Sequence, residues 1–372
     1  MPNILLVHSA LSAGGSTDLA ISDAVGLRSQ GFEVGFASEP GRRTEDMRAQ
    51  GIRLHRLYFV DPGRYPAWVR YLLGVPVSTA LLLYFVIRYG YRYLYVQHRQ
   101  SGIPSTLVAH FTGAKYVFIS HSELGRLNRG RLLTPLGRNV IAVSDQVKRN
   151  LITYFRTAPD RVTVIPNATR TEVRQAGEAA RMAFREKWDI SPDQPVVACV
   201  AMLVEIKAHD VLLRAWARLV RHHPRAVLVL TGEGPLRQWL EELSRKLGIT
   251  ETVRFVGFVE DLAVVYSCAS LVVLASRSEG LPGAILEASA YGVPAVATAV
   301  SGTPEIVLPE RTGLLVEPDD PEQLARAIAR LLSDENLRER LGRAARELVV
   351  RKYSMESRQR TLADYFRGLE RA

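Results

Sequence analysis

The stretch Ser276–Val307, SRSEGLPGAILEASAYGVPAVATAVSGTPEIV, decides the fold of the chain around it. The apolar run from Leu271 to Ala275 precedes it and predicts a buried parallel strand, and the Ala-rich run from Ala284 to Tyr291 predicts a helix. A Gly-Val-Pro turn ends that helix, and Ala295–Ala299 predicts the next strand. Strand, loop, helix, turn and strand form one βαβ unit, whose ligand site is expected at the carboxyl ends of its strands.

Two carboxylates, Glu279 and Glu287, stand eight positions apart in this stretch. Glu279 follows the first strand in a Gly- and Pro-containing loop, and Glu287 lies about two turns along the helix, on a face that can point back to the same crevice. The loop Ser301–Glu305 follows the next strand and predicts backbone N–H groups at a helix start, which suit a phosphate. The alternative is that the carboxylates only complement helix dipoles, although a loop position at a strand end is poorly explained by helix stability.

The segment EGLPGAILE, from Glu279 to Glu287, resembles the E-x7-E motif of the retaining glycosyltransferases of family 4. The following GVPAVATAVSGTPEIV and the TGLLVEP at Thr312–Pro318 are also similar to that family, and the resemblance is strongest from about Val196 onward. It implies the GT-B fold, an α/β architecture of two Rossmann-like parallel-sheet domains facing a central cleft.

The domain boundaries expected on this basis leave a hinge in the polar segment 168–195, which has no strand pattern. Residues 1–170 are expected to form an acceptor-binding domain and residues 171–353 a nucleotide-sugar-binding domain. Residues 354–372 are expected to form a helix that packs back on the first domain.

The reaction implied by the resemblance moves a sugar, with retention, from a UDP- or GDP-sugar to an acceptor hydroxyl, without a cofactor or a metal ion. Breaking the anomeric bond places negative charge on the departing diphosphate, so cations and N–H donors are needed there. The resemblance implies that Lys207 faces the diphosphate, Glu279 binds sugar hydroxyls, Glu287 binds the ribose, and His121 lies near the transferred sugar.

The expected catalytic residues are therefore His121, Lys207 and Glu279. A glycine pair between the first strand and the first helix lets the backbone approach a ligand closely, which adds Gly14 and Gly15. The full set expected to bind the sugar donor is Gly14, Gly15, Lys207, Phe258, Glu279, Gly280, Leu281, Pro282, Glu287, Gly302 and Thr303.

Two positions depart from the family pattern. Met202 stands where a phosphate-binding arginine is usual, and Ala208 stands where a glycine is usual. Loss of one cation at the diphosphate weakens leaving-group stabilisation. A non-catalytic nucleotide-sugar-binding protein therefore stays open as an alternative. A nucleotide-sugar 2-epimerase is a second alternative, because such enzymes share the two-domain architecture, although the E-x7-E spacing argues against it.

The composition is that of a globular protein with two domains: 372 residues, 47% apolar and 23% charged. The two cysteines, Cys199 and Cys268, allow no disulfide framework or zinc spacing, and this favours a reducing cytosol. The N-terminal MPNILLVHSA lacks the features of a secretory signal, so a cytoplasmic location is expected.

The net charge of +10 is concentrated in one region. Residues 62–159 carry thirteen Lys or Arg against two acids, and residues 62–122 carry no acid but eight of the fourteen tyrosines. Within this region the uncharged run 71–87 has 17 residues, too few for an unflawed membrane span.

Two interpretations of this region remain. One is a buried helix of the first domain with solvated arginines, which we favour for the helix itself. The other, favoured for the region as a whole, is an interfacial patch with Trp68 and the tyrosines at headgroup level. No nucleic-acid-binding module is visible. The prediction is peripheral contact of residues 62–159 with the cytoplasmic face of an anionic membrane, and a lipid-linked or cell-surface acceptor of polysaccharide biosynthesis. The cations of the interfacial interpretation are Arg64, Arg70, Arg88, Arg92 and Arg99.

Overall fold

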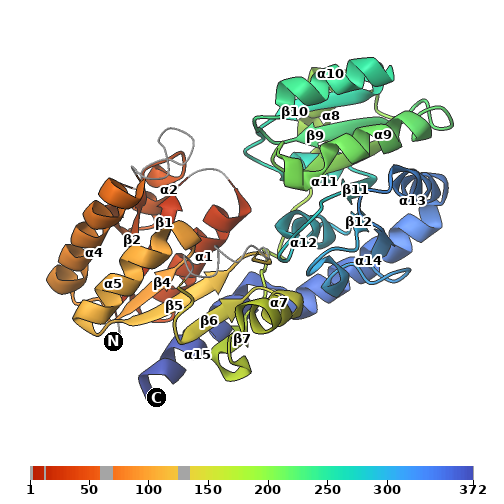
Figure 1. Cartoon of the computed structure of the whole chain (residues 1–372). Coiled ribbons are helices and arrows are strands. Elements are labelled where there is room, and N and C mark those ends of the chain that lie inside the picture. Colours follow the sequence, from red (N-terminus) through yellow and green to blue (C-terminus); the bar gives the residue numbers. More distant parts are fainter. Residues whose placement is uncertain (1–2, 12–13, 59–69, 125–134, 372) are drawn as a thin grey trace. The chain divides into compact units, whose positions relative to one another are not determined.

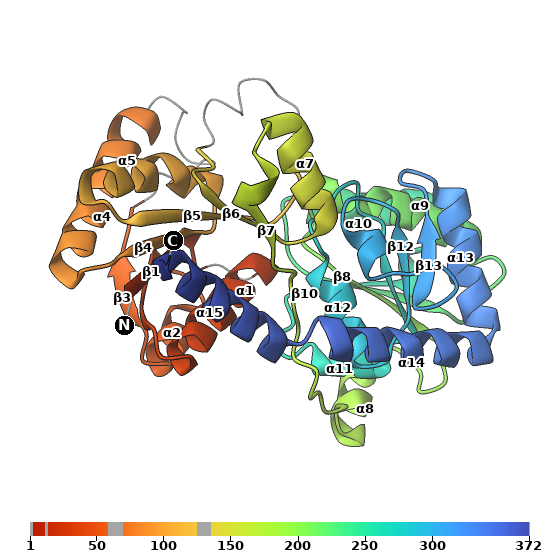
Figure 2. The ribbon, with the colours of Figure 1, turned by 90° about the horizontal axis from the view of Figure 1, so that it is seen from below.

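The computed structural model describes residues 3–11, 14–58, 70–124 and 135–371. Its contacts divide the chain into two compact units: unit 1 is Met1–Asn167 with Met355–Ala372, and unit 2 is Ala168–Ser354. Each unit is built on one parallel β-sheet flanked by helices (Figures 1 and 2). The expectation of two parallel-sheet α/β domains is confirmed.

Unit 1 has a seven-stranded sheet in the order β3-β2-β1-β4-β5-β6-β7. All of its strand pairs are parallel, with Ile4 of β1 opposite Val34 on one side and Tyr93 on the other. Its elements are β1 (Asn3–Ala10), α1 (Gly15–Ser29), β2 (Glu33–Glu39), α2 (Thr44–Ala49), β3 (Arg53–Arg56), the π-helical turn η1 (Arg70–Gly74), α4 (Val75–Tyr89), β4 (Tyr93–Val96), η2 (Arg99–Ser101), α5 (Gly102–Thr112), β5 (Lys115–Ser120), β6 (Asn139–Ala142), α7 (Asp145–Phe155), η3 (Pro159–Arg161), β7 (Val162–Val164) and α15 (Met355–Arg371).

Unit 2 has a six-stranded parallel sheet in the order β10-β9-β8-β11-β12-β13. The polar segment in which the hinge was expected contains a helix, α8, which belongs to this unit. The elements are α8 (Glu178–Lys187), β8 (Val196–Val200), η4 (Glu205–Lys207), α9 (His209–Leu219), β9 (Val227–Thr231), α10 (Arg237–Leu247), η5 (Thr250–Thr252), β10 (Val253–Gly257), α11 (Ala263–Cys268), β11 (Leu271–Leu274), α12 (Gly283–Ala290), β12 (Ala295–Thr298), η6 (Thr303–Glu305), β13 (Gly313–Val316), α13 (Pro321–Ser333) and α14 (Glu335–Lys352).

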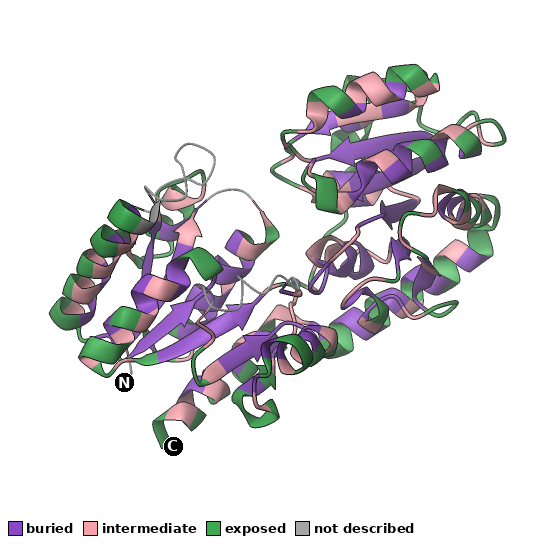
Figure 3. Cartoon of the chain, in the orientation of Figure 1, coloured by how far each residue is buried: buried purple, intermediate pink, exposed green. Residues whose placement is uncertain are grey.

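The central strands are apolar throughout because helices cover both of their faces. Residues 4–7 of β1 and 196–198 of β8 are all 0% exposed, and Figure 3 shows the strands of both units as buried. Some helices start at a residue whose side chain accepts hydrogen bonds from the N–H groups of the first turn. Asp320 accepts hydrogen bonds from the N–H groups of Glu322 and Gln323 at the start of α13, and Ser144 does the same for Val147 at the start of α7.

Helix α15 lies beside α1 in unit 1 (Figure 2), and a buried ion pair holds it there. The Arg358 guanidinium donates to both carboxylate oxygens of Asp23 on α1, each at 2.8 Å, and the two side chains are 1% and 0% exposed. It also donates to the carbonyls of Ile165 and Pro166, and the Tyr95 hydroxyl donates to Asp23 at 3.0 Å. Burial alone would lower the pKa of Arg358, but the Asp23 carboxylate reverses the effect and the pKa is raised.

The prediction of a buried helix at 71–87 is wrong. Between Leu72 and Tyr89 only 22% of residues are buried, although the mean hydropathy of this stretch is 1.7. The prediction that the tyrosines of this region lie at a surface is also wrong for four of them: Tyr91, Tyr93, Tyr95 and Tyr116 are core residues. Arg64 and Trp68 lie outside the described residues, as does the side chain of Arg70.

Candidate functional site

The centre of the unit 2 sheet is a point where strand order reverses. β8 pairs with β9 on one side and with β11 on the other, so the loops after β8 and β11 leave the sheet edge in opposite directions. Ligands bind parallel α/β sheets in the crevice that forms at such a point. Lys207 follows β8 and Glu279 follows β11, and their spatial proximity is a consequence of this topology.

Lys207 and Glu279 form an ion pair at this edge of the sheet. The Lys207 Nζ atom lies 2.6 Å from Glu279 Oε1, and the same oxygen accepts a hydrogen bond from Ser276 Oγ at 2.6 Å. Glu279 is 8% exposed and Ser276 is fully buried. The carboxylate is therefore fixed by two donors, and the ammonium is fixed at a strand end that a ligand could approach.

Arg277 ties the loop that carries Lys207 to the end of β11. Its main-chain N–H donates to the carbonyl of Ile206 at 2.8 Å, and its side chain donates to the carbonyl of Glu205 at 2.8 Å. The guanidinium also pairs with Asp210 at 3.2 Å and with Asp319 at 2.8 Å. These bonds span both sides of Lys207, so Arg277 sets where that ammonium lies.

Glu287 on α12 is paired with a buried tyrosine. Tyr266 of α11 donates its hydroxyl to Glu287 Oε2 at 2.8 Å, and its ring stacks on Tyr291 at 5.4 Å. Burial and the Glu287 charge raise the pKa of Tyr266 well above its usual value, so the hydroxyl stays a proton donor. Glu287 is half-buried, which leaves carboxylate surface for a ligand.

The prediction that the N–H groups of Gly302 and Thr303 are available to a phosphate requires correction. The N–H of Gly302 donates to the Gly280 carbonyl at 3.1 Å, and the N–H of Thr303 donates to the Val300 carbonyl at 3.0 Å. The reason is that η6 is a turn of three residues whose amides close the loop onto itself and onto the Glu279 loop. This hydrogen bonding instead fixes Gly280, beside the candidate carboxylate.

The remaining residues expected in unit 2 differ in exposure. Met202, at the usual arginine position, is 51% exposed, and Phe258 is 45% exposed after β10. Leu281 and Pro282 are buried. Ala208 adopts a left-handed conformation, with φ of 49°, which explains why a glycine is usual there.

Gly14, Gly15 and His121 belong to unit 1. Gly14 precedes α1 with φ of 152° and Gly15 is its first residue, and a Cβ on either would meet no atom within 4 Å. His121 follows β5, and its Nε2 atom lies 3.0 Å from Oε1 of Gln97, which follows β4.

His121 is one of three histidines at the carboxyl edge of the unit 1 sheet. His8 on β1 and His98 after β4 share a hydrogen bond of 2.9 Å between their Nε2 atoms, and the His98 and His121 rings are 6.1 Å apart. Burial lowers the pKa of His8 to about 3, that of His98 to about 4 and that of His121 well below its usual value. All three are neutral at pH 7, so they can hydrogen-bond a hydroxyl but cannot supply a cation.

Several residues of these sites were not predicted from the sequence. Ser276 and Arg277 directly follow a predicted strand, so the rule that sites form at strand ends could have identified them. His8 was open to the same inference. Tyr266 carries no comparable signal, because it lies inside a short helix and meets Glu287 only through packing.

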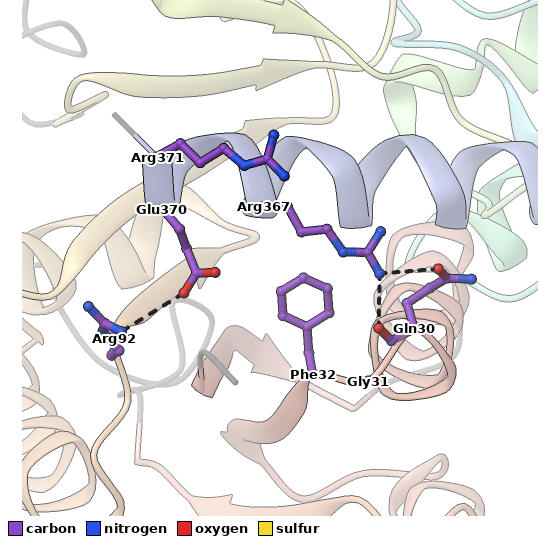
Figure 4. A pocket seen from close by; sticks show the side chains of 7 residues that line it. All are labelled: Gln30, Gly31, Phe32, Arg92, Arg367, Glu370 and Arg371. Carbon is purple, nitrogen blue, oxygen red and sulfur yellow. Dashed lines mark hydrogen bonds and ion pairs between the residues drawn. The ribbon is translucent and has the colours of Figure 1, made fainter.

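A cavity of about 470 Å³ lies elsewhere, at the amino edge of the unit 1 sheet (Figure 4). Arg92 pairs there with Glu370 at 3.9 Å, and Arg367 donates to the Gln30 carbonyl at 3.0 Å. Ligands of parallel sheets bind at the opposite edge, so we attribute this cavity to the packing of α15. No group of three or more His, Cys, Asp or Glu suited to a metal ion occurs among the described residues.

The turn after β9 packs closely against the loop that carries Met202. A Cβ on Gly234 would lie 2.3 Å from the carbonyl oxygen of Leu203, whereas a Cβ on Gly283 would meet no atom within 4 Å. Gly234→Ala is therefore expected to lower the free energy of unfolding by about 1–3 kcal/mol, measured by urea denaturation. Gly283→Ala is the matched control and should change it little, and equal stability of the two variants would contradict the close approach.

Comparison with protein families matches the two halves of the chain to two consecutive models. Residues 13–173 match the model described as Glycosyltransferase Family 4, and residues 180–348 match Glycosyl transferases group 1.

Among curated proteins, the chain is 33% identical over 223 residues to an uncharacterized glycosyltransferase of Methanocaldococcus jannaschii, covering 59% of this chain and 57% of that protein. It is 29% identical over 277 residues to the GDP-mannose-dependent alpha-(1-6)-phosphatidylinositol monomannoside mannosyltransferase of Mycobacterium tuberculosis, covering 72% and 70%. The first alignment thus spans little more than half of the relative's length.

Solved structures share the fold over nearly the whole chain. A glycosyltransferase from Rickettsia africae has a TM-score of 0.84 at 20% identity, covering 100% of this chain and 99% of that chain. Anabaena HepE in complex with UDP-glucose has a TM-score of 0.86 at 18% identity, covering 98% and 99%. The expectation of a GT-B fold is confirmed.

Proposed function

We propose that this chain, whose two halves match the models described as Glycosyltransferase Family 4 and Glycosyl transferases group 1, transfers a sugar, with retention, from a nucleoside diphosphate sugar to an acceptor hydroxyl. The observation that carries the proposal is the Lys207–Glu279 ion pair at the strand-order reversal of unit 2, with Glu287 on the helix that follows. An ammonium beside a carboxylate in a crevice suits a substrate that joins an anionic diphosphate to a neutral, hydroxyl-rich sugar.

Each residue has a chemical task in this proposal. Lys207 stabilises the negative charge that develops on the diphosphate when the anomeric bond breaks. Glu279, held by Ser276, accepts hydrogen bonds from sugar hydroxyls, and Glu287, held by Tyr266, accepts them from the ribose. The neutral His121 side chain contributes a hydrogen bond to a sugar or acceptor hydroxyl.

The first test is ligand-induced thermal stabilisation with UDP, GDP, ADP and their sugars. A ligand at 100 times its Kd adds about 2.7 kcal/mol to stability, which corresponds to a rise in Tm of roughly 5–10 °C for a unit of this size. Glu287→Gln should weaken binding of the stabilising nucleotide about tenfold or more, because it loses a charge-assisted hydrogen bond.

Glu241→Gln is the control, since Glu241 is an exposed carboxylate on α10 paired with Arg237. It should leave the nucleotide response unchanged. Stabilisation by no nucleotide, or an equal response from both variants, would count against the proposed donor site. The relatives do not agree on a nucleotide, since HepE binds UDP-glucose and the mycobacterial enzyme depends on GDP-mannose.

A second function is favoured by one observation, the half-exposed Met202 at the position of the usual arginine. A non-catalytic protein would bind the nucleotide sugar and release no nucleoside diphosphate on any acceptor. Met202→Arg would then create turnover where the unchanged protein has none. Turnover in the unchanged protein, insensitive to EDTA, would instead support a metal-independent transferase.

We place the acceptor on a lipid-linked or cell-surface glycan precursor and the protein at the cytoplasmic face of a membrane. The basic, acid-free region 62–122 supports this, because anionic lipid surfaces attract such segments. The mycobacterial relative acts on a phosphatidylinositol mannoside, which is a lipid acceptor.

A further inference from the structure

Helix α4 presents an apolar stripe on its exposed side. Leu73, Val77, Ala80, Tyr84 and Ile87 follow one another at spacings of four and three residues and so share one face. All five are exposed, with Leu73 at 60%, Tyr84 at 57% and Ile87 at 69%. A surface helix normally carries charged side chains on this face, and this stripe has none.

The opposite face of α4 is packed on unit 1. Gly74, Ser78, Leu82 and Val86 recur every four residues and are buried, and the Ser78 hydroxyl donates to the Tyr58 carbonyl at 3.1 Å. The helix is therefore an integral part of the domain rather than a free membrane span. A helix that is apolar on all sides but buried on only one needs an apolar environment for the rest.

The exposed apolar surface extends onto the neighbouring helix. α5 packs against α4, and the two lie side by side in Figure 1. Phe111 of α5 is 70% exposed and Leu107, one turn earlier, is 39% exposed. We call the stripe of α4 together with these two residues the α4–α5 face. Exposed apolar surface of this extent on a folded domain marks an interaction site.

The charge that helices α4 and α5 and their flanking residues contribute around the α4–α5 face is positive. Arg88 in the last turn of α4 and Lys115 at the start of β5 are exposed, whereas Arg92, just before β4, pairs with Glu370 of α15. No aspartate or glutamate occurs between residues 62 and 122. Long cationic side chains beside an apolar surface can place their charge at lipid headgroups while their stems stay in the apolar layer.

We propose that the α4–α5 face docks the protein on an anionic lipid bilayer, with α4 lying in the plane of the interface. Leu73, Ile87 and Phe111 enter the acyl region, Tyr84 lies at headgroup level, and Arg88 pairs with lipid phosphate. This inference deepens the proposed function, since it places the enzyme where a lipid-linked acceptor would be. It concerns a surface of unit 1 and uses none of the donor-site residues of unit 2.

A bilayer fits this face better than a second copy of the chain. Two copies meeting through their α4–α5 faces would bring cations together with no carboxylate from residues 62–122 to balance them. Anionic phospholipids supply both the apolar layer and the opposite charge.

The test is sedimentation with vesicles in the absence of nucleotide, comparing phosphatidylcholine with an equimolar mixture of phosphatidylcholine and phosphatidylglycerol. The unchanged protein should bind the anionic vesicles at low salt and lose affinity as salt rises. The double variant Ile87→Ser/Phe111→Ser should bind them about 10- to 100-fold more weakly. Arg88→Gln should weaken binding about fivefold and reduce its salt dependence.

Matched controls come from exposed residues of unit 2. Trp239→Ser/Val350→Ser removes two side chains that are 46% and 48% exposed, and Arg221→Gln removes an exposed charge. These variants should bind vesicles like the unchanged protein. Equal binding by the Ile87→Ser/Phe111→Ser variant would overturn the proposal, as would a dimer that only this variant converts to monomer.

Stabilisation by nucleotide separates this proposal from the proposed function. The vesicle-binding variants should keep the same rise in Tm with the stabilising nucleotide as the unchanged protein. Normal vesicle binding without any nucleotide response would support the docking face and refute the donor site. A normal nucleotide response without vesicle binding would support the donor site and refute the docking face.

Discussion

Glu279→Gln is expected to lower kcat for sugar transfer by about 10²- to 10³-fold with a smaller change in KM, because it removes a preorganised charge from the reacting sugar. The glutamine keeps the shape of the side chain and can still bond to Ser276, so the protein should fold. It cannot hold the Lys207 ammonium as the carboxylate does at 2.6 Å. Release of nucleoside diphosphate from the stabilising nucleotide sugar, with and without acceptor, measures the effect.

A double-mutant cycle with Lys207→Met shows whether the two side chains act as one unit. Residues in direct contact usually show coupling of about 0.5–3 kcal/mol, so the double variant should be less impaired than the sum of the two single variants. Glu310→Gln is the control, because Glu310 forms an exposed ion pair with Arg330 away from this loop. An unchanged kcat in Glu279→Gln, or strictly additive effects, would contradict the proposed role.

Arg358→Met is expected to lower the free energy of unfolding by about 3–5 kcal/mol, because it leaves the Asp23 carboxylate buried without its cation. It also removes the donors to the carbonyls of Ile165 and Pro166, which lie where unit 1 ends before unit 2 begins. Urea denaturation followed by circular dichroism measures the loss. Thermal unfolding of unit 1 should shift in the same direction.

The control lies two residues further along the same helix. Arg360 is 65% exposed and pairs with Glu356 one turn earlier, so Arg360→Met should change stability by less than about 1 kcal/mol. The double variant Asp23→Leu/Arg358→Met should recover much of the loss, because it leaves no unpaired buried charge. If Arg358→Met were no less stable than Arg360→Met, the ion pair would not anchor α15.

The sequence by itself determined the two parallel-sheet domains and most of their strands. Buried parallel strands are short apolar runs, and Leu271–Leu274 or Val196–Val200 can be recognised as such without neighbours. It also placed Glu279 in a loop after a strand, since local pattern alone places a residue before or after a strand, whereas Lys207 was identified through the family resemblance. That they meet in an ion pair depends on strand order, which pairs β8 with β11.

Only the tertiary structure decided which polar groups are hydrogen-bonded within the protein and which apolar side chains are exposed to solvent. The amides of Gly302 and Thr303 were expected to face a phosphate, but in the structure they donate hydrogen bonds to the carbonyls of Gly280 and Val300. Helix α4 was expected to be buried because it is apolar, but hydrophobicity gives no information on how many neighbours cover a helix. Tyr266 and Arg358 gained their partners, Glu287 and Asp23, from segments distant in the chain, and such pairings arise only when the chain is packed.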